Sequence, residues 1–376
     1  MNKALVFLTI LKVVWCDLEY YYDDFNLSEE QGSEPGASCR MADGTQGKCV
    51  QFFLCDSNDK IIMDGRTVID IRETESVCHS YQDICCGLSS IKDDVNPITP
   101  KLAQRKGCGW RNPDGVGFKI TGAEHGEAYF GEFPWMVVIF SIDSPDVPIG
   151  GGSIIHPRAV LTAGHTVNKV RKLKVRAGEW DLNLSTEYYP HQDRDVDTVK
   201  VHHKFNKDNG ANDIAILFLK KAFDLAPNVG VVCLPPAGIR AVGDTECFAS
   251  GWGKKKFDSE QNYQNILKKV NLPVVERGEC QILLQKTRLG PFFQLGSSFM
   301  CAGGRPGQDT CLGDGGSPLV CPVEGDADRY VQNGIVSWGI DCFNGHPGVY
   351  ADVAILREWI DFQMDARGYS NETYSI

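Results

Sequence analysis

From about Cys108 onward, the hydrophobic residues come in short runs of β-branched and aromatic side chains that glycine interrupts. Residues 136–140, 214–219 and 334–339 are typical of these runs. Many short apolar runs separated by turn residues predict the strands of an all-β barrel or sandwich. Only residues 353–360, near the end of the chain, space their apolar positions as a helix does. We therefore expect a mostly β domain that ends in a helix.

The amino-terminal end has a different pattern. Residues 1–16 place a charged start at Lys3 before an apolar stretch that is too short to span a bilayer. This arrangement is typical of a secretory signal peptide. Residues 17–38 are acidic and without periodicity, as expected of a solvated arm. No later segment is apolar enough to cross a membrane, so we expect a secreted, extracellular protein without a membrane partner.

Composition narrows the class of protein. The chain of 376 residues is long enough for one large domain and a small one. A hydrophobic content of 42% together with 39 glycines fits a globular, turn-rich protein. The formal net charge of -11 argues against nonspecific binding to nucleic acid or to an anionic membrane. We therefore expect no nucleic-acid partner.

The 15 cysteines of an exported chain are expected to form disulfides, because the compartment is oxidising. Removing Cys16 with the signal peptide leaves an even number, and six of these cysteines lie in residues 39–86. So small a segment cannot fold on its apolar core alone, and crosslinks of about 2–4 kcal/mol each would supply the missing stability. Zinc is the rival interpretation, but the segment has no Cys-x-x-Cys pair and no histidine at finger spacing. Spacing alone leaves the pairing of the cysteines open.

Three later segments carry the groups that a serine protease uses. Residues 161–165 read LTAGH, residues 212–215 read NDIA and residues 313–318 read GDGGSP. In this order they resemble the motifs of trypsin-like serine proteases, in which a histidine is the general base, an aspartate orients it and a serine attacks the substrate. The resemblance implies a double β-barrel with a degenerate triad of His165, Asp213 and Gly315. Because glycine has no hydroxyl, we expect no catalytic residue at the third position.

The register around Gly315 is fixed by Cys311 and Cys321, which are spaced as in active relatives. Ser317 lies two residues downstream, and an active enzyme that uses Ser317 is a rival hypothesis. Loss of the nucleophile in a related mechanism costs about 10⁶-fold in turnover. The residues therefore favour a binding protein over a hydrolase.

The six cysteines of residues 39–86, which end in Cys85-Cys86, resemble the clip domain of arthropod haemolymph proteases. The mature chain as a whole resembles the clip-domain serine protease homologues, and among them the prophenoloxidase-activating factor II group. The disulfides that this resemblance implies are Cys39–Cys85, Cys49–Cys78, Cys55–Cys86, Cys108–Cys233, Cys247–Cys321, Cys280–Cys301 and Cys311–Cys342. The division of the chain is then a signal peptide (1–16), an acidic arm (17–38), a clip domain (39–86), a linker (87–119), an inactive trypsin-like domain (120–367) and a tail (368–376).

One disulfide of the protease family is missing. Its two positions correspond to Gly150 and Thr166, on either side of the histidine segment. Gly164 also stands beside His165, where the family usually has alanine. Because glycine adds backbone freedom, we expect a loosened histidine loop.

Other residues match the family's substrate site. Asp309 matches the aspartate that selects lysine or arginine. Ser337, Trp338 and Gly339 match the strand that pairs with a substrate backbone, and Gly348 would leave the pocket unobstructed. Two interpretations of these residues stay open. They form either a site that still binds a basic peptide or an inherited scaffold without a ligand.

A third group of residues concerns activation. Lys119 and Ile120 resemble the family's cleavage site, with Asp314 placed to receive the new amino terminus of Ile120. Arg105 and exposed basic residues of the clip region are alternative positions for the cut. We expect the linker to be exposed and accessible to proteases.

Gly178 and Glu179 resemble the start of the family's calcium loop, with Asp181 and Glu187 nearby. A calcium ion held by Glu179 and Glu187 and a plain loop of surface acids are the two interpretations, and no other cofactor is expected. The Asn-x-Ser/Thr sites that could accept glycans are Asn26, Asn183 and Asn371.

The resemblance implies a non-catalytic cofactor of arthropod innate immunity that circulates in the haemolymph. In this role an upstream clip protease cuts the chain, which then assists the activation of prophenoloxidase for melanin formation. Its partners would be that protease and prophenoloxidase or phenoloxidase, and assembly into homo-oligomers after cleavage is left open. The alternatives are a developmental or matrix adhesion protein on the same inactive scaffold, and an enzyme that uses Ser317.

Overall fold

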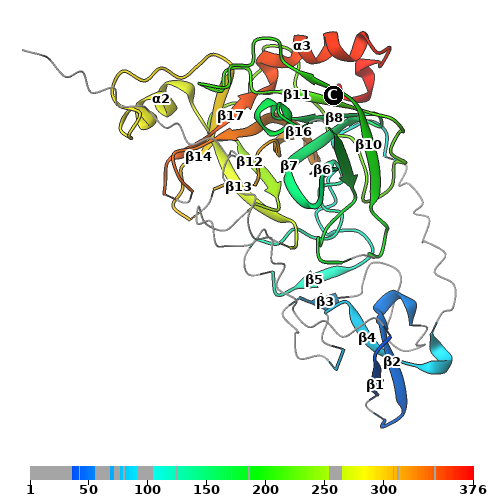
Figure 1. The fold of residues 1–376 in the computed structure, drawn as a ribbon. Helices are drawn as coiled ribbons and strands as arrows, with labels where there is room; N and C mark the ends of the chain where they lie inside the picture. Colours follow the sequence, from blue (N-terminus) through cyan, green and yellow to red (C-terminus); the bar gives the residue numbers. More distant parts are fainter. Residues whose placement is uncertain are drawn as a thin grey trace, which may run out of the picture.

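The structure of the chain is a computed structural model, in which two barrels lie next to a smaller sheet (Figure 1). The residues that it describes are 36–41, 43–55, 68–71, 77–78, 81–91, 105–123, 126–170, 172–184, 187–253, 265–307, 309–310, 313–342 and 344–376. The expected signal peptide, most of the acidic arm, Asn26 and Cys311 lie outside these residues. Within these ranges, no helix is both long and apolar enough to span a bilayer.

The first barrel is built from strands that follow one another closely along the chain. They are β6 (Met136–Ser141), β7 (Ser144–His156), β8 (Ala159–Thr162), β9 (Leu173–Ala177), β10 (Gln192–Val201) and β11 (Ala215–Leu219). Their hydrogen-bonded order is β10-β11-β8-β7-β6-β9, and pairing between β9 and β10 closes the ring. The apolar runs expected at 136–140 and 214–219 form β6 and β11, and every residue of β11 is buried.

The second barrel repeats this plan. Its strands are β12 (Glu246–Gly251), β13 (Lys268–Val275), β14 (Phe299–Gly303), β15 (Pro318–Val323), β16 (Asp326–Trp338) and β17 (Pro347–Asp352). Their order is β12-β13-β14-β17-β16-β15, again as a closed barrel. The expectation of a mostly β, double-barrel fold is therefore confirmed.

Short helices connect and cover the barrels. They are α1 (Gly164–Val167), α2 (Arg277–Gln285) and α3 (Val353–Asp365), with the 3-10 turns η1 (Phe52–Leu54), η2 (Leu88–Ser90) and η3 (Asn371–Thr373). The α3 helix begins after Asp352, whose carboxylate accepts a hydrogen bond from the Ile355 amide at 3.3 Å. Leu356, Ile360 and Met364 recur every four residues and are buried, so one face of α3 covers the barrels.

The last residues of the chain, expected as a tail, pack against the barrels. Tyr374 is fully buried, and its hydroxyl donates to Asp361 at 2.9 Å. Arg357 reaches the hydroxyl of Ser375 at 3.0 Å and lies over the Tyr374 ring, 4.9 Å from its centroid. A buried aromatic ring with a satisfied hydroxyl fixes this segment.

The clip region forms an antiparallel sheet in the order β1-β2-β4, from β1 (Ser38–Arg40), β2 (Gln46–Gln51) and β4 (Asp83–Gly87). The disulfides between described residues are Cys39–Cys85, Cys49–Cys78, Cys55–Cys86, Cys108–Cys233, Cys247–Cys321 and Cys280–Cys301. Each of these pairs is one that the resemblance implies. Cys342 is also disulfide-bonded, and its expected partner Cys311 lies outside the described residues.

The clip region contacts the barrels through a further pair of strands. The strand β3 (Val68–Asp70) pairs in parallel with β5 (Lys119–Thr121), and Figure 1 shows both between the clip sheet and the barrels. Beside them the ring of Phe52 meets that of Phe118 at 5.4 Å between centroids. The described end of the expected linker, from residue 105, runs along the barrels and is fixed there by Cys108–Cys233.

A buried charge network holds this segment in place. The Glu132 side chain is fully buried and accepts hydrogen bonds from Arg111 at 2.5 Å and Lys269 at 2.8 Å. The Arg111 guanidinium also lies 4.4 Å from the ring centroid of Phe248 and donates to the Tyr330 hydroxyl at 2.9 Å. Since a buried charge is costly unless it is paired, these contacts define one position for the segment.

We predict that Glu132→Ala lowers the free energy of unfolding by about 3 kcal/mol, because Arg111 and Lys269 then lose their buried partner. The matched control is Glu246→Ala, whose carboxylate pairs with Arg305 where both side chains are about half exposed. That change should cost about 1 kcal/mol or less. Urea-induced unfolding measures both values, and equal losses in the two variants would contradict the role of the network.

Candidate functional site

The residues expected to act as base and orienting acid meet between the two barrels. The Nδ1 of His165, on α1, lies 2.6 Å from Asp213 Oδ2, and the His165 amide donates to Asp213 Oδ1 at 2.8 Å. The hydroxyl of Ser337, on β16, also donates to Asp213 Oδ2 at 2.6 Å. The side chains of His165 and Asp213 are 4% and 0% exposed. An imidazole oriented by a buried carboxylate is the arrangement that general-base catalysis requires.

Gly315 completes this arrangement without supplying a reactive group. A Cβ atom placed on Gly315 would lie 2.7 Å from His165 Nε2, so position 315 directly faces the imidazole. The Gly315 carbonyl accepts a hydrogen bond from the Gly151 amide at 3.0 Å, which fixes the turn against β7. The geometry of a triad is therefore present, and the atom that would attack a substrate is not.

Ser317 is packed away from the imidazole. It is 1% exposed, and no hydrogen-bond partner contacts its hydroxyl. A Cβ atom placed on Gly151 would lie 2.1 Å from this hydroxyl, and one on Gly251 would lie 3.2 Å away. The hydroxyl thus faces two glycines, where an incoming peptide has no room to reach it.

The two positions of the missing disulfide are in contact. A Cβ atom placed on Gly150 would lie 2.6 Å from Cγ2 of Thr166 and 2.5 Å from the Gly315 carbonyl oxygen. The Thr166 hydroxyl is 3.4 Å from His165 Nε2. Thr166 therefore fills the space beside the histidine, and van der Waals contact stands where the family has a covalent bridge.

The residues expected to line a specificity pocket are also near one another. A Cβ atom placed on Gly348 would lie 3.5 Å from Asp309 Oδ1 and 3.2 Å from the Tyr350 hydroxyl. Asp309 Oδ1 accepts the amide of Thr310 at 2.8 Å. Trp338 is 5% exposed, and the rings that meet its edge or face are those of Phe293 and Phe299. A Cβ atom on Gly339 would meet nothing closer than the Asp341 carbonyl oxygen at 3.8 Å.

The residues expected to act in activation are arranged as in a zymogen, with the Lys119–Ile120 bond intact. Lys119 and Ile120 are consecutive residues of β5, and Ile120 is buried. The carboxylate of Asp314, expected to receive the amino terminus of Ile120, accepts a hydrogen bond from the Gly253 amide at 2.9 Å. Of the expected glycan sites, Asn183 and Asn371 are exposed.

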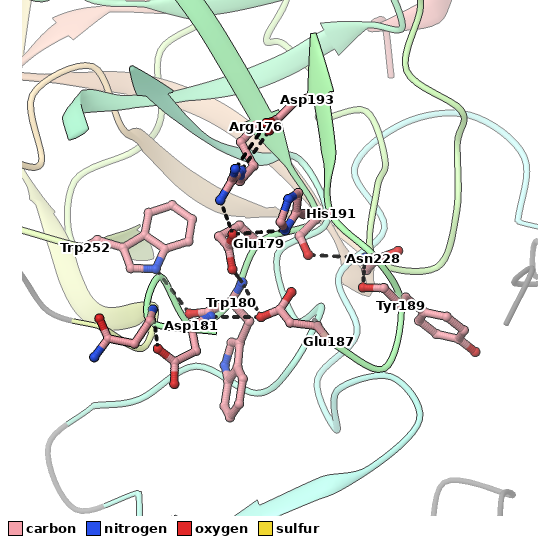
Figure 2. A network of polar contacts seen from close by, with 12 residues as sticks. Arg176, Glu179, Trp180, Asp181, Glu187, Tyr189, His191, Asp193, Asn228 and Trp252 are labelled. Carbon is pink, nitrogen blue, oxygen red and sulfur yellow. Dashed lines mark hydrogen bonds and ion pairs between the residues drawn. The ribbon is translucent and has the colours of Figure 1, made fainter. Parts of the chain in front are cut away.

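The acid loop, which we define as residues 178–187 without 185 and 186, is shown in Figure 2. One oxygen of Glu187 accepts the amides of Trp180 at 3.0 Å and Asp181 at 2.9 Å. The other oxygen, Oε2, is buried and has no hydrogen-bond partner. Glu179 is bound by Arg176 at 3.1 Å and lies 3.3 Å from His191 Nδ1. The expected loop of surface acids is instead largely buried.

Burial makes this pair of carboxylates difficult to ionise. Burial raises the pKa of Glu179 to about 7, although Arg176 opposes the shift. Burial and the charge of Glu179 raise the pKa of Glu187 well above its ordinary value. Of the four oxygens of this pair, Glu187 Oε2 alone has no hydrogen-bond partner, and it is the oxygen that a hard cation such as calcium would bind. Asp181 does not join them, since it accepts hydrogen bonds from Tyr81 and from the Asn183 amide.

Sequence reasoning missed several of these partners. Arg176, on β9, lies three residues before Glu179, and this spacing brings side chains together on a helix but not along a strand, so it gave no signal for the ion pair. Tyr81 is in the clip region, 100 residues from Asp181, and nothing in the local sequence connects them. The bond from Ser337 to Asp213 was also not anticipated, because Ser337 was assigned only to substrate binding.

Similarity to known proteins agrees with this architecture. The model of the trypsin family matches residues 123–360, and the model described as "Serine protease Clip domain PPAF-2" matches residues 36–87. Phenoloxidase-activating factor 2 of Galleria mellonella is 57% identical over 74% of this chain and 97% of its own length. Inactive CLIP domain-containing serine protease A8 of Anopheles gambiae is 39% identical over 84% of this chain and 88% of its own. Inactive CLIP domain-containing serine protease A3 of Aedes aegypti is 42% identical over 83% of this chain and 66% of its own.

These matches cover both parts of the molecule, the disulfide-linked sheet and the double barrel that holds His165 and Asp213. The chain belongs to the trypsin family and, within it, to the clip-domain serine protease homologues.

Proposed function

We propose that this chain is a secreted, non-catalytic serine protease homologue that acts by binding, as a cofactor of prophenoloxidase activation in arthropod innate immunity. One observation carries the proposal: position 315, which faces the imidazole of His165, is a glycine. Without a hydroxyl there is no acyl-enzyme and no first step of peptide cleavage. The burial of Ser317 supports the same conclusion, because its hydroxyl cannot replace the missing one.

The names of the relatives support a role in the melanisation cascade. The Galleria mellonella relative is named phenoloxidase-activating factor 2, and the Anopheles and Aedes relatives are named inactive. The partners of this chain are then prophenoloxidase or phenoloxidase and an upstream clip protease that cuts it. The carboxylate of Asp309 suits a basic segment of such a partner, and at Gly339 a Cβ would make only one van der Waals contact, with the Asp341 carbonyl oxygen at 3.8 Å.

Reconstitution from purified proteins tests this role. Prophenoloxidase and an activating clip protease are incubated with and without the cleaved chain, and phenoloxidase activity is followed with a catechol substrate. We expect activity to rise with the concentration of the cleaved chain and to saturate. No effect at any concentration would contradict the cofactor role and would favour the adhesion alternative.

We predict that Gly315→Ser restores less than about a hundredth of the turnover of an active trypsin-like protease. The new Cβ would lie 2.7 Å from His165 Nε2, so the imidazole has to move, while two hydrogen bonds to Asp213 hold it. A misplacement of about 1 Å in a catalytic group costs on the order of 10²-fold. Hydrolysis of an arginine peptide substrate by the cleaved variant measures the turnover.

Gly315→Ala is the control for this prediction, because it adds the same Cβ without the hydroxyl. The alanine variant should remain inactive and should unfold at the same temperature as the serine variant. Turnover by Gly315→Ser within about tenfold of an active protease would contradict the account of the displaced histidine.

We further propose that Glu179 and Glu187 hold a calcium ion that compensates their buried charge. Calcium should therefore raise the unfolding temperature of the wild type. In EDTA the stability should fall as the pH rises from about 5 to 8. The folded chain keeps a proton on Glu179 up to a pKa of about 7, whereas the ordinary value is 4.5, and this advantage is lost as the proton leaves.

The control variant is Glu187→Gln, which keeps the shape of the side chain and its acceptor oxygen but removes the charge. It should lose the response to calcium and the part of the pH dependence that Glu187 contributes, whereas the part from Glu179, which burial causes, should remain. Thermal unfolding at several pH values, in calcium and in EDTA, measures both effects. An unchanged unfolding temperature of the wild type in calcium would contradict the calcium site.

A further inference from the structure

The Lys119–Ile120 bond lies inside a strand whose edge is already paired. In β5, Lys119 is opposite Val68, Ile120 opposite Ile69 and Thr121 opposite Asp70 of β3. The Ile71 amide extends the pairing by donating to the Thr121 carbonyl at 3.2 Å. A protease of the trypsin class binds the residues around the cleaved bond as an extended strand. That mode of binding needs the edge of β5 that β3 occupies.

The side chains next to this bond are buried as well. Phe118 is 2% exposed and Ile120 is 4% exposed, and both belong to the same apolar core as Ile69. The Lys119 side chain is 46% exposed and pairs with Asp114, so the lysine side chain itself remains accessible to a protease. The obstacle to cleavage is therefore the backbone and its neighbours, not the specificity residue.

An aromatic cluster holds the clip region over this strand. We define the docking cluster as Phe52, Phe53 and Tyr81 of the clip region with Phe118, Trp180 and Tyr188 of the barrel side. Phe52 is stacked with Tyr188 at 6.2 Å and meets the edge of Phe118 at 5.4 Å between ring centroids. Phe53 meets Tyr188 at 5.8 Å, and Tyr81 meets Trp180 at 6.2 Å. Aromatic pairs in such geometries stabilise contacts beyond the area that they bury.

One hydrogen bond fixes the orientation of the docking cluster. The Tyr81 hydroxyl donates to the Asp181 carboxylate, and both side chains are largely shielded from water. Asp181 belongs to the acid loop, and Tyr188 follows that loop directly along the chain. The clip region therefore docks on the acid loop and reaches from there over β5.

The other basic candidate for cleavage has a different environment. Arg105, Lys106 and Gly107 are all exposed and belong to no strand. The Arg105 guanidinium donates to the Arg111 carbonyl and to Asn112, both at 3.1 Å, and lies over the Trp110 ring, 5.5 Å from its centroid. Trp110 Nε1 donates to the Lys106 carbonyl at 2.9 Å, and no strand pairs with the Arg105–Lys106 bond. Exposed backbone outside regular structure is the usual substrate of proteolysis.

We propose that the docked clip domain shields the Lys119–Ile120 bond and directs a lysine/arginine-specific protease to Arg105–Lys106. The protease adds water across that bond, which leaves a carboxylate on Arg105 and an amine on Lys106. This inference rests on the proposed activation by cleavage. Beyond that proposal, we infer that the docking cluster determines which of the two bonds is cleaved.

The choice of bond has a covalent consequence. All six clip cysteines pair among themselves, and the next disulfide, Cys108–Cys233, begins after Arg105. A cut at Arg105 therefore leaves no disulfide between the clip domain and the barrels, and among the described residues the docking cluster and the β3–β5 pairing hold the clip domain in place. A cut at Lys119 would leave it tethered through Cys108. Cleavage at Arg105 is also unable to create an amino terminus at Ile120, so Asp314 keeps its bond to Gly253.

Limited digestion of the full mature chain with bovine trypsin tests the proposal. New amino termini are quantified by mass spectrometry over time, and the products are run on denaturing gels without reductant. In the wild type we expect termini at Lys106 or Gly107, and a clip fragment that separates on the denaturing gel. The same fragment should elute together with the barrels from a native size-exclusion column.

Two variants weaken the contact between the clip domain and β5, one with a substitution in the clip region and one with a substitution on the barrel side. Ile69→Asp places a charge in the buried contact of β3 with β5 without adding a trypsin site, and Tyr188→Ala removes a ring from the barrel side without changing the clip domain. In each, the terminus at Ile120 should appear at least about tenfold faster, since cleavage of a protected bond follows the population of the open form. The control is Ile239→Asp, at a position that is 62% exposed in the barrel region. It should digest like the wild type.

A terminus at Ile120 that forms in the wild type as fast as in Ile69→Asp and Tyr188→Ala would overturn the inference while leaving the proposed activation by cleavage intact. Absence of any cut between residues 105 and 120 in the wild type would also overturn the inference, and absence of any cut before residue 120, the clip region included, would contradict both. If Arg105→Gln combined with Lys106→Gln still released a separate clip fragment on the denaturing gel, the assignment of the bond would be wrong.

Discussion

The buried carboxylate of Asp213 is the constraint on which the site depends. A charge without access to water is tolerated only when hydrogen bonds replace its hydration. Asp213 obtains these bonds from the amide and Nδ1 of His165 and from the Ser337 hydroxyl. The donors come from both barrels, so the contact that orients the imidazole also holds the two barrels together. A hydroxyl at position 315 would not be one of these donors, and its absence leaves the fold and the site geometry in place.

The stability of the fold and the loss of the nucleophile are therefore separate. Asp213 and its donors hold the two barrels together, and the acid loop of the first barrel contacts the clip region. Within that loop Asp181 faces Tyr81 of the clip region, while Glu179 and Glu187 are buried together behind it. The loop is therefore at once a charge site of the barrel and the surface on which the second domain rests.

The sequence predicts those features that are local or that a family motif specifies. Short apolar runs interrupted by glycine predicted strands such as β6 and β11, and the order of the motifs placed His165 opposite Gly315. The pairing of the cysteines came from the family resemblance, because spacing alone could not select it. Features formed by residues far apart in the sequence could not be predicted from it. The contacts of Phe52 with Tyr188 and of Tyr81 with the acid loop join residues far apart in the sequence through tertiary packing. The three-residue pairing of β3 with β5 is too short to show a periodicity. The burial of Tyr374 in an expected tail has the same origin.

Covalent labelling measures the central claim most directly, because an activated serine reacts with an aryl fluorophosphonate whether or not its natural substrate is known. The cleaved chain is incubated with the probe beside an active trypsin-like protease, and the intact mass of each is determined. Our account predicts that the protease gains one adduct and that this chain keeps its mass. A stoichiometric adduct on this chain, at Ser317 or at any other residue, would contradict the account and identify the protein as a hydrolase.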